Sequence, residues 1–120
     1  MKAMLLKALG PMSPLATPLV LADMPQPAPS PTEVLIRVSV CGVCHTELNE
    51  IEGRTPPPSL PVIPGHQVVG VVESSGAEAN EIRAGDRVGV AWIGGACRAC
   101  PRCIEGRENL CEQFRAAGTR

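Results

Sequence analysis

Four cysteines within fifteen residues form the pattern with the most specific chemistry in this sequence. They follow a C-x2-C-x2-C-x7-C spacing, at Cys97, Cys100, Cys103 and Cys111. The two-residue gaps let neighbouring thiolates converge on one ion, and the longer gap lets the chain return with a fourth sulfur. Four thiolates make the closed tetrahedral shell of structural zinc, so the sequence predicts a zinc lobe over residues 94–114.

Two other uses of these cysteines are less consistent with the sequence. Disulfides would suit a secreted protein, but no secretory signal is present, and a reducing cytoplasm would keep such thiols free. An iron–sulfur cluster also takes four thiolates, but the ferredoxin run has a shorter last gap and a proline after its fourth cysteine. Here Pro101 follows the second cysteine. We therefore expect zinc and a cytoplasmic location.

A second group of metal-binding residue types lies upstream. The run CGVCHTE covers Cys41 to Glu47, and His66 follows Cys44 after twenty-two residues. A thiolate at the end of one strand and an imidazole at the start of the next can meet at one ion, giving two ligands of an open zinc site. Spacing alone leaves alternatives open. Cys41 and Cys44 could be buried thiols or a redox pair, although the βαβ context of thioredoxin-like motifs is missing, and His66 could be a hydrogen-bonded turn residue.

Length and composition restrict the fold that positions these residues. A chain of 120 residues is expected to form one domain, 1–120, with a modest core. Thirteen prolines and twelve glycines, with one Phe, one Trp and no Tyr, indicate a mainly β domain with many turns. The net charge of −1 without a basic stripe argues against nucleic acid and membrane surfaces as partners. No apolar stretch approaches the roughly 20 residues of a membrane span.

Periodicity and turn residues predict five strands, over residues 1–8, 19–22, 33–40, 67–74 and 88–92. The first two are expected to pair as a hairpin. Alternation at Leu35, Arg37 and Ser39 predicts that the third is half-buried, and Gly70 is expected to mark a bend or a close approach. The last strand should follow a turn at residues 85–87.

A short helix is predicted over residues 44–51, with Thr46 placed to cap it and Gly53 to end it. The following segment, residues 55–64, carries five prolines and is expected to be irregular.

The order and spacing of CGVCHTE, PGHQVVGVV, AGDRVGVAW and the four-cysteine run ending in GRENLCEQF resemble the N-terminal half of zinc-dependent medium-chain alcohol dehydrogenases. The resemblance extends from Met1 to Phe114. It implies a GroES-like partial β-barrel with short helices and a protruding structural-zinc lobe. It also implies an enzyme that transfers hydride between a small-molecule alcohol and NAD or NADP, with zinc as the Lewis acid. The lobe argues against the zinc-free quinone reductases of the same family.

The resemblance assigns roles to individual residues. Cys44 resembles the first catalytic zinc ligand and His66 the second, whereas Cys41 falls on a position that is not a ligand. Thr46 matches the catalytic hydroxyl that takes the alcohol's proton, although a helix cap is the commoner role of such a threonine. His45 matches a catalytic-site residue near the cofactor pyrophosphate, so it is also expected to bind cofactor.

Three positions depart from the family pattern. Glu47 replaces the usual Asp, and Gln67 replaces the usual Glu; both would lie behind the metal ligands. A neutral amide in place of a carboxylate there could cost about 10–100-fold in metal affinity or activity. Asn49 stands where many members carry a relay histidine, and an amide does not titrate near neutral pH. The proton would have to leave through water or along another path.

Two parts of the family enzyme are missing from this sequence. No cysteine remains to serve as the third catalytic ligand, and no G-x-G-x-x-G marks a Rossmann domain. We therefore expect an N-terminal fragment that is inactive by itself and could self-associate through exposed barrel edges. The alternative is a non-catalytic, zinc-stabilised domain with a vestigial catalytic site.

Overall fold

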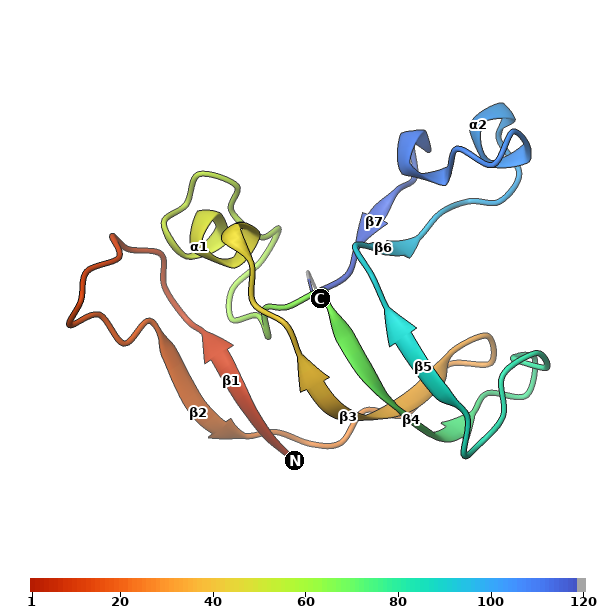
Figure 1. Ribbon diagram of the computed structural model, residues 1–120, viewed down its shortest axis with the longest axis horizontal. Helices are drawn as coiled ribbons and strands as arrows, with labels where there is room; N and C mark the ends of the chain where they lie inside the picture. The colour runs from red at the N-terminus through yellow and green to blue at the C-terminus, as the bar shows by residue number, and fades with distance from the viewer. Residues whose placement is uncertain (119–120) are drawn as a thin grey trace.

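The computed structural model describes residues 1–118 and shows a mainly β molecule with a protruding lobe (Figure 1). Its strands form three separate antiparallel sheets. One sheet pairs β1 (Lys2–Leu6) with β2 (Leu19–Asp23). The largest has the order β3-β4-β5, comprising β3 (Val34–Cys41), β4 (Val68–Ser75) and β5 (Arg87–Val90). The third pairs β6 (Ile93–Gly95) with β7 (Arg115–Ala116). Over residues 1–118 these sheets do not join into a closed barrel.

The helices are short and lie between the strands. They are α1 (His45–Ile51), α2 (Pro101–Ile104) and the 3-10 helix η1 (Glu108–Leu110). Within the described part of the chain, none is long and apolar enough to cross a membrane.

Most of the predicted elements are confirmed, with small differences at their ends. The first two strands form the expected hairpin, and the helix ends before Gly53, which has a φ of 75°. The predicted cap was wrong, because Cys44 caps α1 and the backbone N–H of Thr46 donates to its sulfur. The last predicted strand is shorter than expected and ends at Val90, which leaves Trp92 outside it.

The predicted half-burial of the third strand is also wrong. From Arg37 to Cys41 every residue of β3 is exposed, including Val38 at 55% and Val40 at 57%. Register shifts occur between Leu35 and Ile36 and again between Val38 and Val40. Such bulges disturb the regular alternation of faces. Moreover, among the strands of residues 1–118, β3 pairs with β4 alone.

The apolar core is small and lies where the hairpin meets α1. Leu6, Ile51 and Val62 are its buried members, and Leu6 and Val62 exchange two backbone hydrogen bonds of 2.9 and 3.1 Å. Met12 and Leu19 pack against them. These contacts join the hairpin to the otherwise irregular segment that leads into β4.

Gly70 is a close approach of two strands, as predicted. A Cβ atom at this position would lie 2.5 Å from the carbonyl oxygen of Arg37 and 2.6 Å from the Ile36 side chain. Only glycine lets β3 and β4 keep this separation.

Replacing Gly70 with alanine should therefore destabilise the protein. Overpacking against backbone typically costs about 1–3 kcal/mol, more than alanine gains in strand propensity. Gly89→Ala is the matched control, because its Cβ would meet only Val68 O at 3.7 Å. Urea unfolding followed by the fluorescence of Trp92 measures both variants. Equal free energies of unfolding would contradict the proposed close approach.

Candidate metal centres

The sheet register brings the upstream cysteine and histidine to the same place. Cys41, the last residue of β3, pairs with Val68, the first residue of β4. Cys44 lies three residues beyond that pair and His66 two residues before it, so both leave the sheet at the same end. The Gly42 N–H also donates to the carbonyl of the residue that follows His66, at 2.9 Å, and closes the ladder at this end.

Cys44 is held as the N-cap of α1. Its sulfur accepts the Thr46 N–H at 3.4 Å, and its own N–H donates to Glu47 Oε2 at 2.7 Å. This reciprocal arrangement is a capping box, with a thiol in place of the usual hydroxyl. The cap fixes the direction in which the Cys44 sulfur points.

The sulfur of Cys44 lies 3.5 Å from Nε2 of His66. With metal–sulfur and metal–nitrogen bonds of about 2.3 and 2.05 Å, two ligands of one tetrahedral zinc ion lie roughly 3.6 Å apart. His66 is only 6% exposed. The separation and the burial of this pair fit a zinc ion bound by both residues.

Glu47 supports the histidine from the opposite side. Its Oε1 lies 2.8 Å from His66 Nδ1 as an ion-pair contact, although it makes no hydrogen bond of regular geometry. A carboxylate at Nδ1 draws the ring proton there and leaves the Nε2 lone pair facing Cys44, the arrangement found behind metal-binding histidines. The ligand atoms of Cys44, Glu47 and His66 all lie within 4.8 Å of one another. Glu47 lies on the Nδ1 side, so we assign it to orientation rather than to ligation.

Two buried carboxyl groups in this region have opposite pKa shifts. Burial acts to raise the pKa of Glu47, but hydrogen bonds from the backbone N–H groups of Cys44 and Glu47, together with His66, lower it overall. Burial and the nearby charge of Glu47 raise the pKa of Glu50, whose Oε2 is buried without a hydrogen-bond partner. Glu47 is therefore the ionised member that faces the histidine. No pattern in the sequence indicated that Glu50 would be buried.

The other residues expected at this site lie further from its centre. Gln67 is exposed, and no side-chain hydrogen bond between it and His66 is seen in the described residues. His45 is exposed, and Thr46 is half-buried on the first turn of α1. Cys41 is exposed, points its thiol at Gly42 O over 3.6 Å and does not belong to the ligand cluster.

Two aromatic side chains that the sequence analysis did not single out lie beside the histidine. The Trp92 ring stands edge-on to His66, with centroids 5.0 Å apart and planes at 86°. Phe114 lies against Trp92 at 6.2 Å. Trp92 follows the end of β5, which pairs with the start of β4. The same register that brings His66 to this end therefore brings Trp92 there as well.

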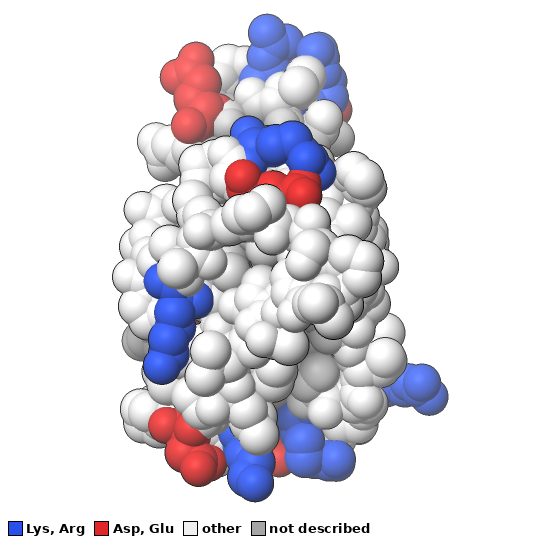
Figure 2. All heavy atoms as spheres, turned by 90° about the vertical axis from the view of Figure 1, so that its left-hand side faces the viewer, with Lys and Arg blue, Asp and Glu red and all other residues white. Residues whose placement is uncertain are grey.

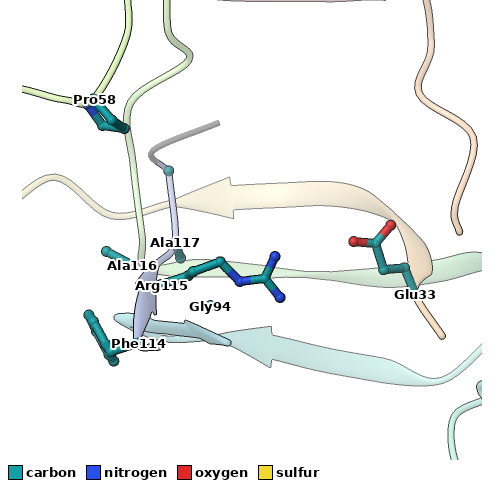
Figure 3. A pocket seen from close by; sticks show the side chains of 8 residues that line it. Glu33, Pro58, Gly94, Phe114, Arg115, Ala116 and Ala117 are labelled. Carbon is teal, nitrogen blue, oxygen red and sulfur yellow. The ribbon is translucent and has the colours of Figure 1, made fainter. Parts of the chain in front are cut away.

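Two hollows open elsewhere on the molecule. One of about 540 Å³ is lined by Glu33, Pro58, Phe114 and Arg115 among others, and Figure 3 shows Arg115 extending toward Glu33. Phe114 and Trp92 stand between this hollow and His66. Another, of about 550 Å³, lies between β1 and β3. Neither is lined by Cys44 or His66.

The four lobe cysteines converge as their spacing predicts. Their sulfurs lie within 4.8 Å of one another. Cys103 is 3.9 Å from Cys97 and 3.6 Å from Cys100, close to the roughly 3.8 Å between sulfurs on a tetrahedral zinc. All are free thiols. The pairing of β6 with β7, which the sequence analysis did not foresee, holds the two ends of the lobe together.

Backbone N–H groups point at these sulfurs and prepare them to bind a cation. The N–H groups of Ala99 and Cys100 donate to Cys97 at 3.5 and 3.2 Å and lower the pKa of its thiol to about 6. Burial and the neighbouring Cys100 thiol raise the pKa of Cys103 to about 12. Four sulfurs this close cannot all ionise without a cation among them. The donor set therefore fits structural zinc.

Replacing Cys103 with serine should remove the zinc of the lobe. Cys103 is buried at the centre of the sulfur cluster, so its loss opens the tetrahedral shell. Cys41→Ser, at an exposed thiol outside both clusters, should keep the wild-type zinc content. Native mass spectrometry counts the metal per chain. Equal zinc in the two variants would refute the lobe assignment.

The zinc-free protein should be alkylated fastest at Cys97 among the lobe cysteines. With a pKa of about 6 this thiol is mostly ionised at pH 7, and its reaction should slow as the pH falls through 6. Cys103, raised to about 12 and buried, should react slowest. Peptide mass spectrometry after brief iodoacetamide treatment measures the order. Zinc should protect both residues but not Cys41, and uniform reactivity would contradict this electrostatic difference.

Comparison with known proteins places this arrangement in a family. The alcohol dehydrogenase GroES-like domain matches residues 30–119. An alcohol dehydrogenase of Geobacillus stearothermophilus is 45% identical over 102 residues, which are 84% of this chain and 30% of the relative.

Solved structures agree with the sequence match. An NAD-dependent alcohol dehydrogenase superposes with a TM-score of 0.86 at 32% identity, over 99% of this chain and 34% of its own. A cobalt- and zinc-bound thermostable alcohol dehydrogenase from Pyrobaculum aerophilum gives 0.87 at 31%, over 99% and 35%. The chain thus spans about a third of the length of these proteins. On its sequence, its fold and its two clusters of ligands, this chain belongs to the alcohol dehydrogenase family and contains its GroES-like domain.

Proposed function

We propose that this chain is the zinc-binding N-terminal part of an NAD- or NADP-dependent alcohol dehydrogenase. The observation that carries the proposal is the 3.5 Å separation of Cys44 Sγ and His66 Nε2, with Glu47 behind the histidine. Thiolate and imidazole are the soft and borderline ligands that suit catalytic zinc. When bound, the metal supplies a Lewis acid that polarises an alcohol or carbonyl oxygen. The substrate class is a small-molecule alcohol, aldehyde or ketone.

Residues on α1 would perform the remaining chemistry at this site. The Thr46 hydroxyl, on the first turn of α1, would accept the proton of the alcohol and pass it outward. His45, exposed beside it, would face the phosphates of the cofactor. Asn49 cannot continue a proton relay, since it is an amide and its Oδ1 already accepts Arg54 Nε at 2.7 Å. Thr46 would then deliver the proton to solvent.

We place the protein in the cytoplasm and treat residues 1–120 as one domain with the lobe at 94–114. Six free cysteines support a reducing compartment, because sulfurs 3.6–3.9 Å apart would readily oxidise elsewhere. The cofactor would be bound by a partner domain, since the printed sequence contains no G-x-G-x-x-G turn.

The second candidate function is a zinc-stabilised domain without catalysis. A catalytic zinc site usually has three protein ligands. The upstream cluster of the described residues offers two, Cys44 and His66, together with Glu47, which orients the histidine. This incomplete set favours the second candidate. We expect the 120-residue chain alone to show no turnover with nicotinamide cofactor and alcohols. Measurable turnover by the purified chain would overturn this expectation and the second candidate together.

Cobalt should bind between Cys44 and His66 and quench the only tryptophan. Trp92 contacts His66 at 5.0 Å, and a paramagnetic ion on that histidine lies close enough to quench its emission. Cys44→Ser should abolish the quenching, whereas Cys41→Ser is the matched control and should retain it. Glu47→Gln should weaken cobalt binding by about 10–100-fold.

The titration is performed on protein whose lobe is already filled with zinc. A thiolate-to-cobalt charge-transfer band, lost in the same variants as the quenching, identifies the bound sulfur. Quenching that persists in Cys44→Ser would exclude this pair as a metal site, and with it the catalytic proposal.

A further inference from the structure

The outer edge of β2 is an unpaired row of backbone groups. Met1 and Met24 form a hydrogen-bonded pair, in which the backbone nitrogen of each donates to the carbonyl oxygen of the other. At the other end of β1, the N–H and C=O of Leu6 point away from β2 and bond to Val62. Hydrogen-bonded and non-hydrogen-bonded pairs alternate along an antiparallel ladder. In this alternation, the backbone N–H and C=O groups of three β2 residues point away from β1. These residues are Leu19, Leu21 and Asp23, and no other described strand pairs with them.

The side chains along this edge are apolar and exposed. Leu21 is 60% exposed, and Met4, its direct partner on β1, is 43% exposed on the same face. Val20, on the opposite face of β2, is 42% exposed. Figure 2 views the molecule from the hairpin side, where the central surface is mostly uncharged, with single Lys or Arg side chains at its left and right margins. Exposed apolar edge strands are sites of strand pairing unless charge protects them.

We propose that β2 is a docking edge for a second copy of this chain, which adds its own β2 in antiparallel orientation around a two-fold axis at Leu21. This axis pairs Leu21 with Leu21 of the second copy and Leu19 with Asp23. All three outward-facing residues then become hydrogen-bonded pairs, since opposite residues exchange two bonds at every second position. The two hairpins become one four-stranded sheet.

Side-chain complementarity supports this register over its neighbours. One face of the new sheet carries a continuous apolar row, with Met4 and Leu21 of one copy beside Leu21 and Met4 of the other. Asp23 faces Leu19 rather than another Asp23, which avoids like charges directly opposite each other. Asp23 already has Lys2 as its cross-strand neighbour within the hairpin. A shift by one residue would set the outward-facing residues of one copy opposite Val20 and Ala22 of the other, whose backbone groups already bond to β1.

The edge is short, and we therefore expect weak, concentration-dependent association. A five-residue strand offers much less surface than the roughly 800 Å² per partner of a stable interface. Dimers should appear as the concentration approaches about 1 mM, the range of weak contacts. The metal centres take no part in this contact, so its presence or absence does not bear on the catalytic proposal.

The test is sedimentation velocity of the full chain over a concentration series, on the wild type and two lysine variants. Leu21→Lys sets two ammonium groups against each other at the axis and should leave a monomer at every concentration. Leu15→Lys, at a loop residue 93% exposed and away from the edge, adds the same charge and should dimerise like the wild type. Urea unfolding followed by the fluorescence of Trp92 reports whether each variant is folded.

Amide hydrogen exchange provides the second readout, at residue resolution. The N–H groups of Leu19, Leu21 and Asp23 should gain protection as the concentration rises, whereas those of Val20 and Ala22, already bonded to β1, should not change. A monomer at about 1 mM, or dimerisation unaffected by Leu21→Lys, would overturn the proposal.

Discussion

The antiparallel register of β3 on β4 is the constraint on which the rest of the site depends. It aligns Cys41 with Val68, and the Gly42–Gln67 hydrogen bond fixes the strand ends. Cys44 and His66 are distant in sequence but emerge at one point because each lies a few residues beyond the same end of this ladder. A one-residue slip would turn the side chains of one strand to the other face. The glycine at position 70 helps prevent such a slip, because a residue with a Cβ at this point would clash with the backbone of Arg37.

Glu47 joins local helix chemistry to the metal site. The same carboxylate accepts the Cys44 N–H through Oε2 and contacts His66 through Oε1. The helix start and the orientation of the histidine are therefore not independent: a change that frays the first turn of α1 also releases His66. Because Glu is one methylene longer than Asp, it reaches the histidine from within the capping box. Gln67 is exposed, and the carboxylate that contacts His66 is that of Glu47.

The sequence could predict features that depend on local spacing and turn chemistry. The cysteine spacing predicted the lobe cluster, which the structure contains. The five prolines predicted that residues 55–64 would be irregular, as they are. The sequence could not predict what depends on register. The exposure of Val38 and Val40 accompanies the register shifts of β3, and the position of Trp92 beside His66 follows from the ends of three paired strands. The cap prediction was wrong because a cysteine sulfur, in place of the usual hydroxyl, accepts the Thr46 N–H and caps α1.

The two candidate centres differ in how strongly the polypeptide itself supports them. In the lobe, four sulfurs face one another with few apolar contacts; only Cys103 and Cys111 are buried there, while Ile104 is 76% exposed. Little but a metal can hold such a segment, so zinc there acts as its core. Cys44 and His66 instead lie at the end of a sheet and beside a capped helix, with a buried carboxylate behind the histidine. The lobe should therefore depend on zinc for its fold, whereas the second centre is also supported by strand pairing, helix capping and the Glu47 contact.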